Sequence, residues 1–133
     1  MSIQIRKQAL EKRSRLCLPV EVPDHADRAA HMSMDMLFAV KDFNANSQHP
    51  LNIRIGISSG AAVAGIIGKS KFLYDLWGDV VNTASRMESH GIAGRIQMSE
   101  STRQALNQPF SLEHRGFIEV KGKGEMSTWF LNT

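Results

Sequence analysis

The strongest constraint on the fold is a strict alternation of apolar with polar or small residues over positions 51–58. Its apolar members are Leu51, Ile53, Ile55 and Ile57. Successive side chains of a β-strand point to opposite faces, so this pattern predicts a strand with one buried face. Upstream, apolar and small residues recur every three or four positions from Ala26 to Phe43, which predicts a helix with one buried stripe. Asp24, directly after Pro23, is the expected N-cap of that helix.

The rest of the chain continues this mixed pattern. Gly60 is expected to turn the chain into a second apolar strand over 61–67, so that 51–67 forms a hairpin. The elements predicted after it are a loop with aromatic anchors over 69–78, a helix over 79–89, a strand over 95–98, a helix capped by Ser99, and two strands over 116–121 and 127–131 joined by a turn over 121–124. Together these elements predict an α+β or α/β fold with a mostly antiparallel sheet.

Composition limits the kind of protein this can be. A chain of 133 residues, 42% of them hydrophobic, can bury one core, which predicts one domain or a piece of one. The net charge of +3 is too small to require a nucleic-acid partner, and we expect none. The single cysteine, Cys17, excludes an internal disulfide, and no apolar run is long enough to cross a bilayer. We therefore expect a cytoplasmic domain, although a longer parent protein could tether it to a membrane.

The first twenty residues differ from the rest. Five of the sixteen basic residues lie there, and the apolar positions follow neither a helical nor a strand period. A frayed terminus is the favoured interpretation, and a basic arm for nucleic acid or a membrane surface is the alternative. We accordingly divide the chain into an atypical basic segment, 1–19, and a domain, 20–133.

The segment YDLWGDVVNTASRM, residues 74–87, carries the most suggestive polar groups. Asp75 precedes the predicted helix, while Asn82 and Arg86 lie four positions apart on it and share a face. These groups could contact a base and a phosphate, or Asp75 could cap the helix and the other two could be solvated. Spacing alone favours the second interpretation. The five histidines show no metal-ligand spacing, so we place no metal on them.

Three motifs in fixed order, YDxWG, NxASRM and VKGKG, make the chain resemble the class III nucleotide cyclases, the adenylate/guanylate cyclase family. The resemblance runs from about Val20 to Leu131 and covers the C-terminal part of the catalytic domain. It implies a ferredoxin-like α/β sandwich, here incomplete, with a mostly antiparallel sheet and helices on one face.

The resemblance also implies roles for four residues. Asp75 matches the residue that accepts a hydrogen bond from the adenine amino group, and Asn82 matches the residue that orients the ribose. Arg86 matches the residue that stabilises charge on the reacting phosphates, and Lys121 matches a lysine that binds the triphosphate. The implied activity is conversion of ATP to 3′,5′-cyclic AMP and pyrophosphate at the interface of a homodimer or a heterodimer with another cyclase domain. The alternative is a non-catalytic cyclase-like module for nucleotide binding or dimerisation.

The sequence departs from the family in one important respect. The family holds Mg²⁺ or Mn²⁺ with two aspartates, one in an FxDIxGFT-like segment and one in a GD hairpin, and this sequence contains neither motif before Val20. We therefore expect a truncated domain that is inactive alone. Loss of the upstream strands should also leave an unpaired sheet edge beside the strand at 51–57.

Overall fold

The computed structural model describes the chain except for residues 1, 8–9, 16–22, 61–62, 68–72 and 78, and it describes side chains over 23–60 and 80–133. Its elements are β1 (Ser2–Lys7), β2 (Leu10–Arg15), α1 (His25–Ala45), β3 (Arg54–Ser58), β4 (Val63–Ile67), β5 (Leu73–Trp77), α2 (Asp79–Ser89), β6 (Ile96–Ser99), α3 (Glu100–Ala105), β7 (Leu112–Val120) and β8 (Gly124–Leu131).

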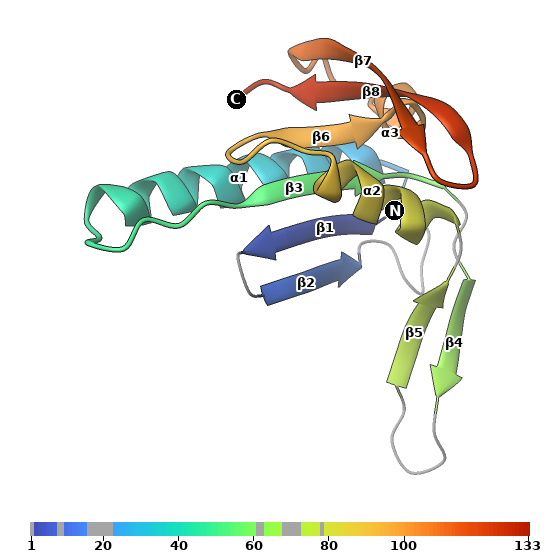
Figure 1. Cartoon of the computed structure of the whole chain (residues 1–133), viewed down its shortest axis with the longest axis horizontal. Coiled ribbons are helices and arrows are strands. Elements are labelled where there is room, and N and C mark those ends of the chain that lie inside the picture. Colours follow the sequence, from blue (N-terminus) through green and yellow to red (C-terminus); the bar gives the residue numbers. More distant parts are fainter. Residues whose placement is uncertain (1, 8–9, 16–22, 61–62, 68–72, 78) are drawn as a thin grey trace.

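Six strands form one mixed sheet in the order β2-β1-β3-β6-β8-β7 (Figure 1). Only the pair β3–β6 is parallel within this sheet, and the other four pairs are antiparallel. The predicted fold class, α+β with a mostly antiparallel sheet, is therefore confirmed. The prediction of a turn over 121–124 is confirmed as well, because this segment connects β7 to β8.

Helices cover both faces of the sheet, so the prediction that they lie on one face is wrong in this detail. Ile55 and Ile57 of β3 share a buried cluster with Ala29 and Ala30 of α1. Gly56, between them in the strand, faces the backbone of α2 instead. Since alternate residues of a strand point to opposite faces, α1 and α2 must lie on opposite sides of β3, as Figure 1 shows.

The helix predicted upstream of the strand is present as α1, but its apolar stripe is buried over only part of its length. The residues of α1 buried against the rest of the chain lie in its first half. Near its end Phe43 is 52% exposed, although the spacing predicts it as part of the buried stripe. Figure 1 shows that the C-terminal end of α1 extends beyond the ends of the neighbouring strands.

The predicted hairpin over 51–67 is wrong. β3 pairs with β1 and β6, whereas β4 pairs with β5 in a separate two-stranded ribbon. The predicted loop over 69–78 is wrong for residues 73–77, which form β5. Two neighbouring apolar runs predict two strands, but nothing in their periodicity says that they pair with each other.

The N-terminal residues are also more regular than predicted. β1 and β2 form a hairpin, and β1 pairs with β3 so that Ile3 lies opposite Ile57 and Ile5 opposite Ile55. The predictions of a frayed terminus and of an unpaired edge beside 51–57 are both wrong, because β1 occupies that edge. The division of the chain at residues 19 and 20 stays a prediction.

Asp27 of α1 joins the helix to the segment that follows α3. Its Oδ1 accepts hydrogen bonds from the backbone N–H groups of Asn107 (3.0 Å) and Gln108 (3.2 Å), and Oδ2 accepts one from Asn107 Nδ2 (3.2 Å). The carboxylate is buried, with only 3% of the residue exposed. This buried carboxylate therefore ties the first turn of α1 to the segment after α3.

We expect Asp27→Ala to lower the free energy of unfolding by about 2 kcal/mol, because the loop donors lose a charged acceptor in a buried position. Urea denaturation followed by circular dichroism measures this change. Asp35→Ala, at an exposed position of the same helix, is the matched control and should change stability by less than about 0.5 kcal/mol. Equal effects of the two substitutions would contradict the anchoring role.

Candidate functional site

The outer face of α2 presents the polar residues that the sequence predicts to be functional. The helix buries Val80, Val81, Thr83, Ala84, Met87 and Glu88. Asn82 and Arg86 are exposed and follow each other by one helical turn. The predicted shared face of these two residues is therefore confirmed.

Asn82 and Arg86 line a cavity of about 620 Å³ together with Lys121. The other residues around it are Thr83, Ser85, Val120, Gly122 and Lys123. Lys121 and Lys123 come from the turn between β7 and β8, in which Gly122 has a φ of +84° and Gly124 a φ of +73°. Glycine adopts such left-handed conformations without strain, so the turn can carry two lysines close together.

Charge in this cavity is of one sign. Arg86, Lys121 and Lys123 contribute three cations, and none of the described residues that line the cavity is acidic. An arginine offers a planar set of donors that fits phosphate or carboxylate oxygens, and a lysine acts as a compact positive charge. The cavity is therefore suited to an anion with several oxygens.

Three of the four predicted site residues thus come together. The fourth, Asp75, lies in β5 opposite Gly65 of β4, and its side chain lies outside the described part of the chain. Lys123 was missed by the sequence analysis. The signal that could have found it is the repeat Lys-Gly-Lys-Gly, since two lysines flanking one glycine in a tight turn can both reach the same side.

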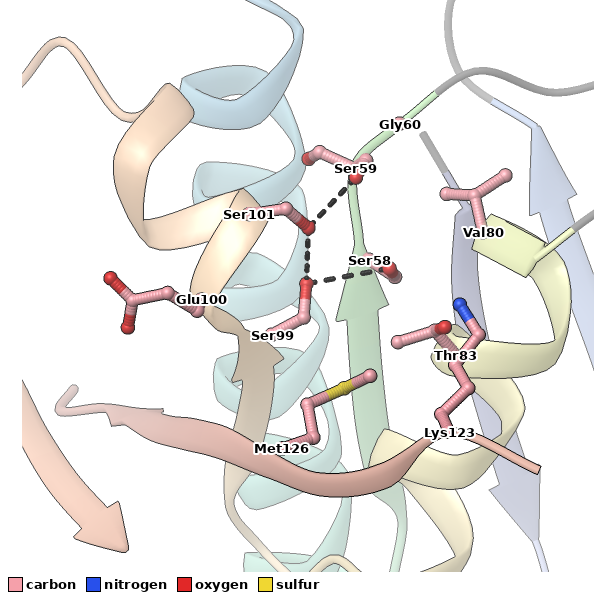
Figure 2. A pocket seen from close by; sticks show the side chains of 10 residues that line it. All are labelled: Ser58, Ser59, Gly60, Val80, Thr83, Ser99, Glu100, Ser101, Lys123 and Met126. Carbon is pink, nitrogen blue, oxygen red and sulfur yellow. Dashed lines mark hydrogen bonds between the residues drawn. The ribbon is translucent and has the colours of Figure 1, made fainter. Parts of the chain in front are cut away.

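A second cavity, of about 380 Å³, lies on the sheet side of α2 and shares Thr83 and Lys123 with the first (Figure 2). Hydroxyl groups from three segments meet at its wall. Ser99 Oγ donates to Ser58 Oγ (3.3 Å) and lies 2.8 Å from Ser101 Oγ, which donates to the carbonyl oxygen of Ser59 (2.8 Å). This network connects the end of β3 to the start of α3, behind the helix that carries Asn82 and Arg86.

Glu100 is the acid beside this second cavity, and its carboxylate points away from the serines (Figure 2). It accepts hydrogen bonds from the Arg103 guanidinium and from the Trp129 indole N–H. The hydrogen bond from Arg103 lowers the pKa of Glu100 below its ordinary value, so the carboxylate stays ionised further into the acidic range than a free glutamate does. Its charge is thus engaged outside the cavity.

A divalent metal does not fit the described residues by themselves. Over the described parts of the chain, no three His, Cys, Asp or Glu side chains are close enough together to hold a metal ion. Nor does any helix in the described part have the length and apolarity needed to span a membrane.

Comparison with known proteins gives a consistent result. The family described as adenylate and guanylate cyclase catalytic domain matches residues 14–133. A membrane guanylyl cyclase of Dictyostelium discoideum is 48% identical over 113 residues, which is 85% of this chain and 7% of that protein. An adenylate cyclase of Mycobacterium tuberculosis is 41% identical over 114 residues, which is 86% of this chain and 26% of that protein. The chain thus spans only a small part of these curated relatives.

A solved structure of a cyclase domain superposes on most of this chain. The guanylate cyclase domain of RhGC from Catenaria anguillulae, in complex with GTP, superposes with a TM-score of 0.80 at 43% identity, covering 87% of this chain and 64% of that one. Sequence and fold agree on one assignment. The chain belongs to the class III family of adenylate and guanylate cyclase catalytic domains.

Proposed function

We propose that this chain supplies the nucleotide half of a cyclase active site that converts ATP to 3′,5′-cyclic AMP and pyrophosphate. The observation that carries the proposal is the cavity lined by Asn82, Arg86, Lys121 and Lys123, which combines one amide with three cations. A nucleoside triphosphate presents several negative charges next to a ribose with hydrogen-bonding hydroxyls. The cavity offers complementary groups to both parts.

Each residue has a role in the proposed reaction. The ribose 3′-hydroxyl releases its proton to water, its oxygen bonds to the α-phosphorus as the bond from that phosphorus to the bridging oxygen breaks, and pyrophosphate departs with the electron pair. Asn82 orients the ribose so that its 3′-oxygen faces the phosphorus. Arg86 stabilises the negative charge that grows on the phosphate oxygens, while Lys121 binds the triphosphate. Lys123 adds a second positive charge for the departing pyrophosphate.

We propose that the carboxylates that hold the divalent metal belong to a second cyclase domain. The family is generally dependent on a divalent ion, Mg²⁺ or Mn²⁺ by our expectation, and the described residues do not form a group that fits one. A heterodimer with a cyclase domain that has the two metal aspartates would place those carboxylates next to the cavity of this chain. We further expect the domain to act in the cytoplasm, where ATP is abundant.

A non-catalytic module is the second candidate function. It is favoured by the lack of a fitting metal group in the described part of the chain. Such a module would bind a nucleotide triphosphate in the same cavity and would not increase product formation by any partner. Product measurement in the presence of a partner therefore separates the two functions.

The choice of base rests on Asp75, since relatives of this chain include both guanylyl and adenylate cyclases. An ionised carboxylate only accepts hydrogen bonds, so it complements the adenine amino group and opposes the carbonyl at the same position of guanine. Sites that bond a specific polar group can reject an analogue without it by up to about 10⁴-fold.

We therefore expect Asp75→Cys to lower the ratio of kcat/KM for ATP to that for GTP by at least about tenfold. The measurement uses residues 20–133 joined to the N-terminal part of a related cyclase, with both nucleotides assayed under the same conditions. Asp42→Cys, at an exposed position of α1, is the control and should leave the ratio unchanged. An unchanged ratio in Asp75→Cys would mean that this carboxylate does not contact the base.

A further inference from the structure

The helix that carries Asn82 and Arg86 rests on one face of the sheet, chiefly on β3 and also on the neighbouring strands β1 and β6. In β3, Ile55 and Ile57 face α1, so Arg54, Gly56 and Ser58 face the other side of the sheet. Ser58 lines the second cavity together with Val80 and Thr83 of α2 (Figure 2). Three alternate positions of β3 therefore form the centre of the surface on which α2 lies, with β1 and β6 on either side.

Gly56 fixes how closely α2 approaches the strand. A β-carbon at this position would lie 2.2 Å from the Glu88 backbone nitrogen and 2.5 Å from the Ala84 carbonyl oxygen. Such distances are far below van der Waals contact, so the helix backbone touches the strand directly. Only glycine permits this approach at Gly56.

An ion pair fixes the last turn of the helix on the same face. Both Nε and Nη2 of Arg54 lie 3.0 Å from Glu88 Oε1. Glu88 is 4% exposed, and the Arg54 side chain is 33% exposed. A buried carboxylate that loses its partner is strongly unfavourable, so the pair resists both rotation and sliding of α2 at this end.

The ion pair lies on the opposite side of the helix from the predicted catalytic groups. Glu88 follows Arg86 by two residues, which corresponds to about 200° of rotation around the helix axis. A rigid helix converts any shift of Glu88 into an equal shift of Arg86. A displacement of about 1 Å in a reacting or stabilising group can cost about 10²-fold in rate.

We propose that Arg54 and Glu88 are positioning residues of the cyclase reaction, which hold Arg86 and Asn82 in place from the far side of α2. This inference rests on the proposed function, because Arg86 must act on the reacting phosphates for its placement to matter. It goes beyond that function by assigning a role to two residues that do not touch the cavity.

Glu88→Gln tests this role with little change in shape. In a mixture with a homologous cyclase that keeps its metal aspartates but lacks its own asparagine and arginine, kcat should fall about tenfold while KM for ATP changes by less than about threefold. Arg54→Lys keeps the charge but not the paired donors, so an intermediate loss is expected. Assays are made at a temperature at which circular dichroism shows every variant to be folded, which removes a purely structural effect.

Glu113→Gln is the matched control. Glu113 lies in β7, at the far edge of the sheet, and forms an ion pair of 2.7 Å with Arg95. It should leave kcat unchanged. A fall in kcat as large as that of Glu88→Gln, or a loss confined to KM, would overturn the inference.

A second measurement keeps the inference separate from the proposed function. In the isolated ¹⁵N-labelled chain, the Nε–Hε resonance of Arg86 should respond to added inorganic triphosphate, and Glu88→Gln should shift or broaden that resonance before any addition. If wild type gives no product with the partner, the proposed function fails. The Arg86 Nε–Hε resonance then still tests whether Glu88 positions Arg86. An Arg86 resonance identical in wild type and Glu88→Gln overturns the positioning role.

Discussion

Arg86→Ala should reduce cyclic AMP formation by the mixed dimer about 10²–10³-fold, the loss typical of removing one preorganised donor from a site of developing charge. The dimer contains this chain and a homologous cyclase that retains its metal aspartates but lacks its own asparagine and arginine. Arg86 is exposed in the same cavity as Lys121, so the substitution removes a cation without disturbing the core. The reduction should therefore appear in kcat, with the thermal midpoint of unfolding almost unchanged.

Controls for this experiment come from the same chain. Lys41→Ala removes an equal charge from an exposed position of α1 that does not line the cavity, and it should leave product formation within twofold of wild type. This chain without a partner should form no product. If Arg86→Ala restored product formation in the mixed dimer as fully as wild type does, the assigned role would be excluded. If wild type restored none, although sedimentation showed a mixed dimer, the non-catalytic module would be favoured.

Gly56→Ala should lower the free energy of unfolding by about 3 kcal/mol, the upper part of the range for inserting a methyl group into a packed interior. The new β-carbon would meet backbone atoms of α2, at 2.2 Å from the Glu88 nitrogen and 2.5 Å from the Ala84 oxygen. Backbone cannot turn aside as a flexible side chain does, so the helix has to move away from β3. Denaturant unfolding measures the loss of stability, and the rate of the mixed dimer should fall with it.

Gly60→Ala is the matched control. A β-carbon there would lie 3.7 Å from the nearest atoms of Val80, which is ordinary contact. Its effect on stability should stay within about 1 kcal/mol. Similar losses in the two variants would mean that the close approach of α2 to Gly56 does not govern its packing.

The sequence predicts the elements of this fold better than their partners. The alternation over 51–58 and the helical spacing from Ala26 predict β3 and α1, because both patterns arise from burial of a face. Strand pairing is a different matter. The same alternation cannot say that β3 pairs with β1 and β6 and not with β4, since pairing depends on residues far away in the chain.

In the site, too, the sequence predicts the local geometry better than the contacts between distant segments. The shared face of Asn82 and Arg86 follows from helical geometry, and their roles follow only from the resemblance to the cyclases. That Lys121 joins them could not be derived from spacing, because β6 and β7 lie between α2 and the lysine turn. The ion pair between Arg54 and Glu88 spans 34 positions and leaves no local pattern in the sequence.

The two walls of the cavity differ in how firmly the rest of the fold holds them. α2 lies on β3, a strand with neighbours on both edges and a helix on each face, so opening that wall requires disruption of the core. The wall that bears Lys121 and Lys123 is an exposed hairpin turn with two left-handed glycines. Buried elements open rarely, whereas exposed turns fluctuate on nanosecond to microsecond timescales. An anion bound as proposed would thus lie between a wall that is built into the core and an exposed turn, and the turn of the lysines is the wall that can yield when the anion leaves.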